Sequence, residues 1–266
     1  MQKQEIEFNH SVVSSPYANP LISSFLDKRS RIRTPVGYPW GIHGFLETQF
    51  SDHIARGSAT FISKSCILTA AHCLYSPHRE EPKSIVFYLG MNQSFKFDFR
   101  RGVQLVTKYT KKVEGLEIYV HSSYLEEEDE NYDFGIVKLG EDTGREVGWA
   151  SLKSPDHNEL ESMQVNVTGY PASKSPFNMA FHIPSYNMYT MSGLIKKISK
   201  HKIYYDIDTS GGQSGSGVWR INQDKKIECV GVHTTGGSKL EGNGAVRMNQ
   251  ENISIISEWL SKLGEI

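Results

Sequence analysis

The residue type best suited to nucleophilic chemistry lies in a short glycine-rich stretch, residues 209–217. This stretch reads Thr-Ser-Gly-Gly-Gln-Ser-Gly-Ser-Gly, and four glycines fall within its last seven residues. Glycine allows tight turns and positive φ angles at little steric cost. Ser214, in the middle, could therefore present its hydroxyl outward while neighbouring backbone N–H groups point into one small space. A nucleophile and an oxyanion hole need this arrangement, although most glycine- and serine-rich turns are plain loops.

Two further stretches supply a base and a carboxylate. His72 follows an apolar run and two alanines, and Asp133 precedes the alternating run at residues 134–139. The chain order is His72, Asp133, Ser214, with steps of 61 and 81 residues. This is one of three unrelated orders that build the same triad, in which histidine takes the serine proton and the carboxylate fixes the histidine tautomer. Each residue alone could be a turn histidine, a strand-start carboxylate or a loop serine, but together they predict a catalytic triad.

Three segments carry a resemblance to a known family. They are Thr-Ala-Ala-His-Cys around His72, Tyr-Asp-Phe-Gly-Ile-Val-Lys-Leu around Asp133 and Gly-Gly-Gln-Ser-Gly-Ser-Gly-Val around Ser214. In this order the chain resembles the trypsin-like serine peptidases over roughly residues 35–255, and its last segment is most similar to the bacterial glutamyl endopeptidase (V8-like) branch. The resemblance implies an all-β fold: two six-stranded antiparallel β-barrels of the chymotrypsin type with a C-terminal α-helix.

The same resemblance implies a serine endopeptidase that needs no cofactor. Ser214 would attack the peptide carbonyl and form an acyl-enzyme, His72 would be the base that passes the proton to the leaving amine, and Asp133 would orient the imidazole. The backbone N–H groups of Gly212 and Ser214 would hold the oxyanion. We therefore expect a polypeptide substrate in the cleft between the two barrels. A non-catalytic peptide-binding module on the same fold is the alternative.

The specificity of this expected peptidase depends on His233, nineteen residues after Ser214. In the glutamyl endopeptidase branch, a histidine in a similar stretch binds the Glu carboxylate of the substrate. A threonine five residues before the nucleophile assists it, and Thr209 occupies that place here. The resemblance thus implies a preference for Glu (or Asp) at the residue before the cut. The edge that pairs with the substrate backbone would be formed by Thr234, Thr235 and Gly236.

Two other interpretations of the specificity residues stay open. Asp208 lies six residues before Ser214, where trypsins keep the aspartate that pairs with Lys or Arg, so a basic preference is an alternative. His233 could also be a core histidine beside a strand edge rather than a ligand for the substrate. The whole run at residues 208–214 nevertheless resembles that of Bacillus-type glutamyl endopeptidases, which favours the acidic preference.

Composition gives no sign of other classes of partner. The chain has 266 residues, 38% hydrophobic residues and a formal net charge of −1, so it can form a sizeable core and shows no bulk attraction for nucleic acid or an anionic membrane. No apolar run approaches the ~20 residues of a membrane-spanning helix. The remaining histidines lack metal-ligand spacing, and the acidic run at residues 126–130 is expected to be a solvated loop rather than a Ca²⁺ site. We expect a monomer that binds no metal.

The three cysteines and the N-terminal segment bear on the compartment. In the resembled family, the cysteine beside the catalytic histidine often pairs with one fifteen residues before that histidine, but Gly57 occupies this position. Cys66, Cys73 and Cys229 are therefore expected to be free. The first 30 residues lack the basic-then-apolar pattern of a signal peptide. These features suggest a cytosolic protein or one exported without a signal peptide, such as a secreted effector, and a secreted protein whose leader has been removed is the alternative.

Residues 1–33 are polar and end in a basic run at residues 28–33. They predict an N-terminal arm, or a propeptide that is cut near the basic residues. In the resembled branch, the mature N-terminus contributes to the primary specificity pocket. Trypsins instead use an aspartate just before the nucleophile to hold a new N-terminus. Gln213 stands at that place, so activation of the trypsin type is not expected.

The rest of the chain divides into two sets of short strands. We expect a first barrel over residues 34–148, with His72 and Asp133, and a second barrel over residues 149–266, with Ser214 and the helix. Runs rich in β-branched and aromatic residues predict the strands. They lie at residues 45–50, 57–62, 66–69, 84–90, 116–120 and 134–139, then 163–171, 188–195, 202–207, 217–221, 227–233 and 244–248. Apolar residues at helical spacing predict a helix over 249–263, capped by Asn249 or Asn252 and packed on the second barrel.

Overall fold

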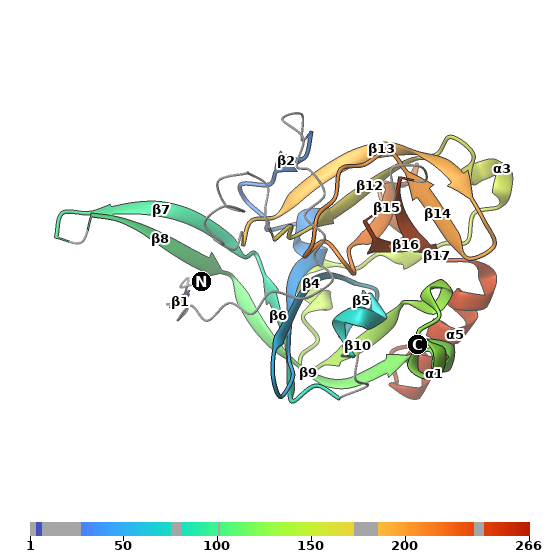
Figure 1. Cartoon of the computed structure of the whole chain (residues 1–266), viewed down its shortest axis with the longest axis horizontal. Coiled ribbons are helices and arrows are strands. Elements are labelled where there is room, and N and C mark those ends of the chain that lie inside the picture. The colour runs from blue at the N-terminus through green and yellow to red at the C-terminus, as the bar shows by residue number, and fades with distance from the viewer. Residues whose placement is uncertain (1–3, 7–27, 76–80, 101, 173–185, 237–241) are drawn as a thin grey trace.

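Two closed β-barrels form the body of the molecule (Figure 1). The computed structural model describes residues 4–6, 28–75, 81–100, 102–172, 186–236 and 242–266. Most of the predicted arm at residues 1–33 therefore lies outside the described residues. Each barrel has six strands with antiparallel pairing, and one longer helix follows the second barrel. The predicted all-β fold of two six-stranded barrels with a C-terminal helix is confirmed.

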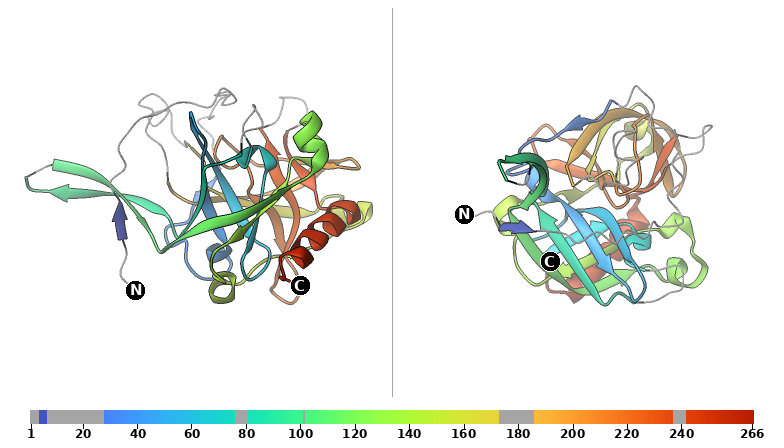
Figure 2. Two further views of the ribbon diagram at one scale, coloured as in Figure 1. Left: turned by 90° about the horizontal axis from the view of Figure 1, so that it is seen from below. Right: turned by 60° about the vertical axis from the view of Figure 1, so that its left-hand side comes forward.

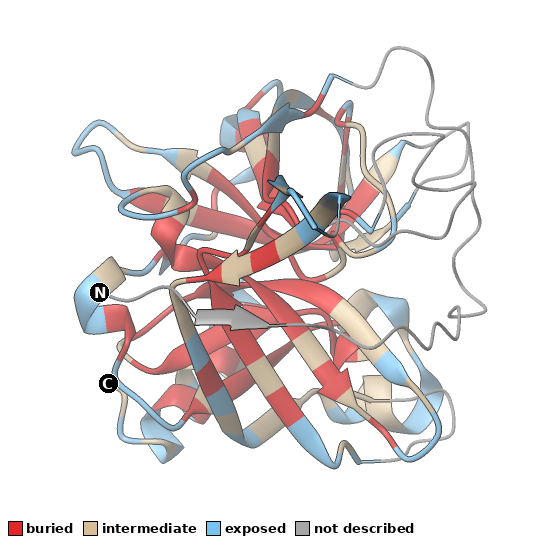
Figure 3. Cartoon of the chain, turned by 90° about the vertical axis from the view of Figure 1, so that its left-hand side faces the viewer, coloured by how far each residue is buried: buried red, intermediate tan, exposed pale blue. Residues whose placement is uncertain are grey.

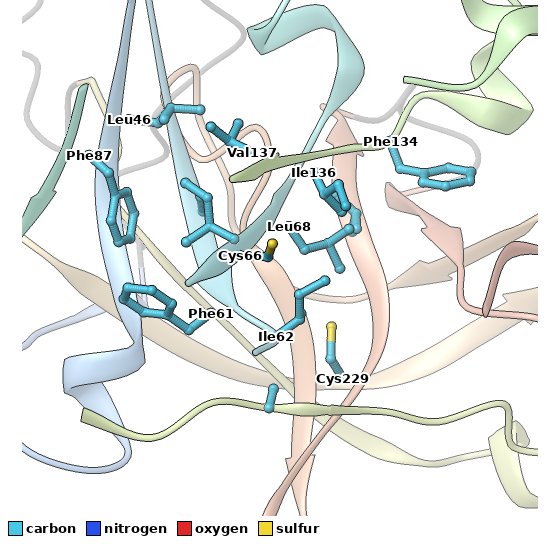
Figure 4. Packing of buried hydrophobic residues seen from close by; sticks show 14 of the residues in the cluster. Leu46, Phe61, Ile62, Cys66, Leu68, Phe87, Phe134, Ile136, Val137 and Cys229 are labelled. Carbon is cyan, nitrogen blue, oxygen red and sulfur yellow. The ribbon is translucent and has the colours of Figure 1, made fainter. Parts of the chain in front are cut away.

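The first barrel closes in the strand order β10-β5-β4-β3-β6-β9. Its core is built from large apolar side chains, and Figure 4 shows Phe61 beside Phe87, with ring centroids 5.4 Å apart. Burying such side chains stabilises the fold by about 1.5–3 kcal/mol each. All six predicted strands are present, and the fifth is longer than expected. They are β3 (His43–Gln49), β4 (Ile54–Phe61), β5 (Cys66–Thr69), β6 (Ser84–Leu89), β9 (Lys111–Val120) and β10 (Gly135–Leu139).

The second barrel follows the order β16-β15-β12-β13-β14-β17 and closes by pairing β17 with β16. Two short strands extend it: β2 (Ser30–Arg31) pairs with β13, and β11 (Ser151–Leu152) pairs in parallel with β16. Buried residues, red in Figure 3, gather along the strands of both barrels. Its six strands are β12 (Gln164–Gly169), β13 (Tyr189–Ile198), β14 (Lys202–Tyr205), β15 (Gly217–Ile221), β16 (Ile227–Thr235) and β17 (Asn243–Arg247).

A hairpin that the sequence analysis did not predict is inserted between β6 and β9. It consists of β7 (Asn92–Asp98) and β8 (Gly102–Tyr109), and β1 (Gln4–Ile6) pairs with the outer edge of β8. Figures 1 and 2 show the hairpin extending away from the barrels. Phe95, Phe97 and Phe99 lie on it with exposed fractions of 77%, 63% and 97%. The alternating phenylalanines are a strand signal, but one without a core to bury them.

Helix α5 (Gln250–Lys262) has the predicted N-cap, because the side chain of Asn249 accepts a hydrogen bond from the N–H of Asn252 at 2.8 Å. The predicted packing partner is wrong. The Trp259 ring lies 6.0 Å from Tyr119 and 5.7 Å from Phe134, and both rings belong to the first barrel. Amphipathic spacing shows that one face is buried but does not say against what. The helix therefore leaves the second barrel and packs on the first.

The connection between the barrels runs from Leu139, the end of β10, to Gln164, the start of β12. The short helices α2 (Gly144–Val147) and α3 (His157–Leu160) lie in it, together with β11. The expected boundary between residues 148 and 149 falls within this connection. Within the described ranges, no helix is both long and apolar enough to span a bilayer.

Candidate active site

A buried strand and a tight turn place His72. Strand β5 ends at Thr69, and a 3-10 turn over Ala71–Cys73 follows at once. The turn closes with a hydrogen bond from the N–H of Leu74 to the carbonyl of Ala71 at 2.8 Å. Ala70 and Ala71 are fully buried, and their small side chains let the turn lie against the barrel. The imidazole of His72 keeps 35% of its surface exposed, so it can reach a substrate.

Asp133 holds His72 through both of its oxygens. Its Oδ2 lies 2.7 Å from Nδ1 of His72, and its Oδ1 accepts the backbone N–H of His72 at 3.0 Å. Asp133 is buried at the end of a 3-10 turn over Glu130–Tyr132. With Nδ1–H donating to the carboxylate, Nε2 of the neutral imidazole is left as a proton acceptor. The predicted histidine–aspartate pair is therefore present with its tautomer fixed.

Burial and charge oppose each other in this pair. Burial acts to lower the pKa of His72, but the negative charge of Asp133 and its hydrogen bond outweigh it, so the pKa is raised well above the ordinary 6.5. Burial likewise acts to raise the pKa of Asp133, while the charge of His72 and its two hydrogen bonds hold that pKa below the ordinary value. The arrangement stabilises an imidazolium beside a carboxylate.

The turn that carries Ser214 is pressed against the first barrel. Gly212 and Gly215 have φ angles of +87° and +84°, a region that favours glycine. A Cβ atom at Gly215 would collide with the hydroxyl oxygen of Thr69 and the carbonyl of Ser58. A Cβ atom at Gly212 would lie 2.5 Å from the carbonyl oxygen of Tyr170. The glycines are therefore required both by conformation and by close approach.

Hydrogen bonds from the first barrel fix the backbone of this turn. The N–H of Ser58 donates to the carbonyl of Ser214 at 2.8 Å, and the Ser58 hydroxyl donates to the carbonyl of Gly212 at 2.8 Å. The thiol of Cys73, next to His72, lies 3.8 Å from the same Ser214 carbonyl. The structure thus brings the predicted serine next to the turn that carries the predicted histidine. A hydrogen bond from the Ser214 hydroxyl to His72 is not formed among the described residues, and such bonds are often long without substrate.

Two backbone donors near Ser214 are available for an anion. Within the described part of the chain, the N–H groups of Gly212 and Ser214 have no hydrogen-bond acceptor. The intervening Gln213 N–H donates instead to the carbonyl of Ser210 at 3.1 Å. An oxyanion hole requires free backbone donors of this kind that are aimed at one point.

His233 is buried on β16, and its environment keeps it neutral. Its Nδ1 lies 2.7 Å from the hydroxyl of Tyr205 on β14. Burial, with smaller contributions from the charges of His72 and Lys202, lowers the pKa of His233 to about 4. Its backbone pairs with the nucleophile turn, because the N–H of Gly215 donates to its carbonyl at 2.7 Å. The backbone of His233 is therefore bonded directly to the turn that carries Ser214.

The other predicted specificity residues are only partly brought together. The hydroxyl oxygen of Thr209 is buried without a hydrogen-bond partner in the described regions. The hydroxyls of Thr234 and Thr235 lie 3.2 Å apart at the end of β16, and Gly236 follows in an exposed position. Asp208, the residue behind the alternative basic preference, accepts the backbone N–H of Lys28 at 3.0 Å.

The family profile described as Trypsin matches residues 37–252. This chain belongs to the trypsin family. The matched region spans both barrels and includes all three predicted triad residues. The family match thus supports a peptidase, at the level of the family. Within the family, the chain is similar to the V8-like, glutamyl endopeptidase branch.

Three curated relatives that are similar to this trypsin-family chain come from bacteria. The extracellular metalloprotease of Bacillus subtilis (strain 168) is 26% identical over 89% of this chain and 69% of the relative. The glutamyl endopeptidase of Bacillus licheniformis is 25% identical over 94% of this chain and 72% of the relative. The glutamyl endopeptidase of Staphylococcus aureus (strain MW2) is 26% identical over 73% of this chain, which spans half of that relative's length.

Solved structures show the same fold. A structure described as Glu endopeptidase in complex with MPD matches with a TM-score of 0.70 and 24% identity, covering 90% of this chain and all of the other. The protease Anisep from Arthrobacter nicotinovorans matches with a TM-score of 0.63 and 16% identity, covering 85% of this chain and 95% of the other. At these identities the likeness concerns the fold alone.

The name of the Bacillus subtilis relative mentions a metal. Among the described residues, no group of three or more His, Cys, Asp or Glu side chains is placed to hold a metal ion. The described residues therefore offer no metal centre. Cys66, Cys73 and Cys229 are buried free thiols, as the sequence predicts.

Three residues around the site of this trypsin-family protein were not found from the sequence. Ser58 bonds the nucleophile turn, Tyr205 bonds His233, and the buried ammonium of Lys202 lies 3.4 Å from the Thr234 hydroxyl. Burial lowers the pKa of Lys202, and the negative charge of Asp133 acts in the opposite direction by attracting the ammonium. None of the three has a sequence signal, because each is an ordinary strand residue whose partner lies far along the chain.

Proposed function

We propose that this trypsin-family peptidase is a serine endopeptidase that forms an acyl-enzyme on Ser214. The observation that carries the proposal is that Asp133 accepts two hydrogen bonds from His72, one from the ring at 2.7 Å and one from the backbone N–H at 3.0 Å. It leaves Nε2 as the proton acceptor on the side chain next to the nucleophile turn. A serine hydroxyl needs such a base, because its own proton is lost too reluctantly at neutral pH.

The reaction follows from the positions of these groups. The Ser214 hydroxyl attacks the carbonyl carbon of the scissile peptide bond while His72 Nε2 takes its proton. The carbonyl oxygen becomes an oxyanion and accepts the N–H groups of Gly212 and Ser214. His72 then gives the proton to the leaving amine, and the acyl group stays on Ser214. A water molecule, deprotonated by His72, hydrolyses the ester and restores the hydroxyl, with Asp133 ionised throughout.

We further propose a preference for Glu (or Asp) at the residue before the cut. When the Tyr205 hydroxyl donates to Nδ1 of His233, the neutral ring carries its proton on Nε2 and can donate it to a carboxylate. The buried hydroxyl of Thr209, which has no partner in the described regions, is a second donor. A carboxylate bound here would also raise the pKa of His233 from about 4, so binding would take up a proton at mildly acidic pH.

The alternative preference for Lys or Arg has less support. The Asp208 carboxylate already accepts the N–H of Lys28, so an incoming ammonium would meet a partly satisfied group. A panel of peptides that differ only in Glu, Gln, Asp, Lys or Arg before the cut tests the choice. We expect Glu to be cleaved fastest and Gln to be cleaved more slowly. Faster cleavage of Lys or Arg would show that Asp208, not His233, selects the substrate.

Activity itself is tested with Ser214→Ala. We expect the variant to fold and to lose peptide cleavage, since the nucleophile is gone while the turn geometry is kept. Wild-type protein that binds the same peptides without cutting them would instead identify a non-catalytic peptide-binding module.

A further inference from the structure

Arg29 is a buried cation at the end of the segment that the sequence predicts as an arm. It lies just before β2, and only 4% of it is exposed. Its Nη1 donates to Oε1 of Gln213 at 2.5 Å and to the hydroxyl of Ser210 at 2.8 Å. Burying a guanidinium is costly unless its donors are satisfied. This contact is therefore a specific one between residues 184 positions apart in the chain.

The acceptor Gln213 stands between the two proposed oxyanion donors, Gly212 and Ser214. Its side-chain oxygen also accepts the N–H of Ser210 at 3.1 Å, and its own N–H donates to the Ser210 carbonyl at 3.1 Å. These bonds close residues 210–213 into a compact loop, and Arg29 contacts both ends of it. The glycines within the loop would otherwise allow its peptide groups to rotate. A rotated peptide would aim its N–H away from the oxyanion.

The segment around Arg29 is itself fixed to the second barrel. The backbone of β2 pairs with β13, with Ser30 opposite Thr190 and Arg31 opposite Tyr189. The N–H of Ile32 donates to the carbonyl of Met188 at 2.8 Å. These backbone bonds fix the segment from which the Arg29 side chain extends. The guanidinium can therefore act as a rigid support for Gln213.

We propose that Arg29 is a positioning residue that keeps the oxyanion donors of Gly212 and Ser214 aligned, so that an uncut chain is competent for catalysis. The inference rests on the proposed role of Ser214. Gln213 stands where trypsins keep the aspartate that holds a new N-terminus, and Arg29 supplies the cation from within the chain instead. A chain cut before Arg29 keeps this support, whereas one cut after it loses the support.

Arg29→Met tests the support, with Arg31→Met as the matched control. Arg31 lies two residues further along the chain, in β2, but its side chain bonds Asn92 and the carbonyl of Gln93. We expect Arg29→Met to lower kcat and the rate of fluorophosphonate labelling about 10- to 100-fold, because both need the oxyanion hole. KM should change less than about threefold, since substrate contacts remain. Arg31→Met should leave all three values nearly unchanged.

Gln213→Met and the double variant show whether Arg29 acts through Gln213. If it does, the double variant is no slower than the slower single variant, whereas independent effects multiply. Arg29→Lys, which keeps the charge but not the fork of donors, should restore part of kcat. Thermal unfolding identifies variants that do not fold. Equal kcat for folded Arg29→Met and wild-type protein, or multiplying effects in the double variant, would overturn the inference.

The N-terminus of the active form gives an answer that needs no variant. Wild-type protein is labelled with a fluorophosphonate, and the first residue of the labelled chain is determined by mass spectrometry. We expect every labelled chain to retain Arg29. Labelled chains that begin beyond Arg29 would refute its role while leaving the proposed function intact. Wild-type protein that takes no label at all would refute the proposed function and this inference with it.

Discussion

The two halves of the candidate site are held in different ways. His72 and Asp133 both belong to the first barrel and hold each other directly, because one carboxylate accepts two hydrogen bonds from His72. Ser214 belongs to the second barrel, but its turn is also held by residues beyond the six strands of that barrel, Ser58 of β4 and Arg29 near the N-terminus. The first half is thus self-contained, and the second is assembled by distant parts of the chain.

This difference separates chemistry from geometry. A substitution in the histidine–aspartate pair should change proton transfer and leave the Ser214 turn in place. A substitution in the supports of the Ser214 turn should leave the pair intact and misplace the nucleophile and the oxyanion donors. Four variants, in order of expected effect, test the two halves separately.

Asp133→Asn should have the largest effect, because an amide cannot accept both the Nδ1–H and the backbone N–H of His72. The histidine tautomer is then no longer fixed, and we expect kcat to fall by about 10⁴-fold. Asp129→Asn is the matched control, since Asp129 caps the same 3-10 turn at 2.9 Å and asparagine is an equally good cap. Loss of activity in both variants would mean that the turn, not the triad carboxylate, matters.

The pH profile sharpens this result. The base must be neutral, and Asp133 raises the pKa of His72 above 6.5, so the wild-type rate should fall as the pH drops through a value above 6.5. This acid limb lies higher than an isolated histidine would give. In Asp133→Asn the limb should move to lower pH. A limb that stays in place would exclude His72 as the titrating group.

Gly215→Ala tests the close approach of the Ser214 turn to the first barrel. The added methyl group would collide with Thr69 and Ser58, and the φ angle of +84° disfavours alanine. We expect kcat to fall by about 10²-fold or more, because a misplaced nucleophile loses its alignment. Gly211→Ala, in the same turn but with no atom within 4 Å of the added group, should retain most activity. Equal activity of the two variants would contradict the required fit.

Ser58→Ala removes a support without touching the triad. The hydroxyl donates to the Gly212 carbonyl and accepts the Tyr170 N–H at 2.9 Å, so both groups would lose this partner. We expect a loss of about 1–3 kcal/mol in the free energy of unfolding, and a fall in kcat of about tenfold. Ser63→Ala also removes a buried two-bonded hydroxyl, but far from the site. It should lose stability while keeping kcat.

Tyr205→Phe should have the smallest effect, and only on specificity. Without the hydroxyl, the proton of His233 can move to Nδ1, and Nε2 no longer donates to a substrate carboxylate. We expect the preference for Glu over Gln to fall about 3- to 10-fold, the equivalent of one hydrogen bond. Tyr204→Phe, its neighbour in β14, should keep the preference. An unchanged preference in Tyr205→Phe would remove His233 from the proposed pocket.

The same division explains what the sequence can predict. The triad residues lie in short local motifs, and the strands that carry them have local patterns, so both could be found. Arg29, Ser58 and Tyr205 act through partners that are 184, 154 and 28 residues away, and no local pattern reports such contacts. The β7–β8 hairpin was not predicted. Its phenylalanines alternate as in a strand, but they are exposed, so the hairpin does not belong to the pattern of core-forming strands. The partner of α5 was mistaken because periodicity shows that a face is buried but not what covers it.

The central claim is that Ser214 is the nucleophile and His72 its base. The most direct test is to label wild-type protein with a fluorophosphonate at several pH values and to map the adduct by mass spectrometry. We predict a single adduct on Ser214, absent in Ser214→Ala, whose rate of formation falls on the acid side with the pKa of His72. No adduct, or an adduct on another serine with the Ser214→Ala variant still labelled, would contradict the account.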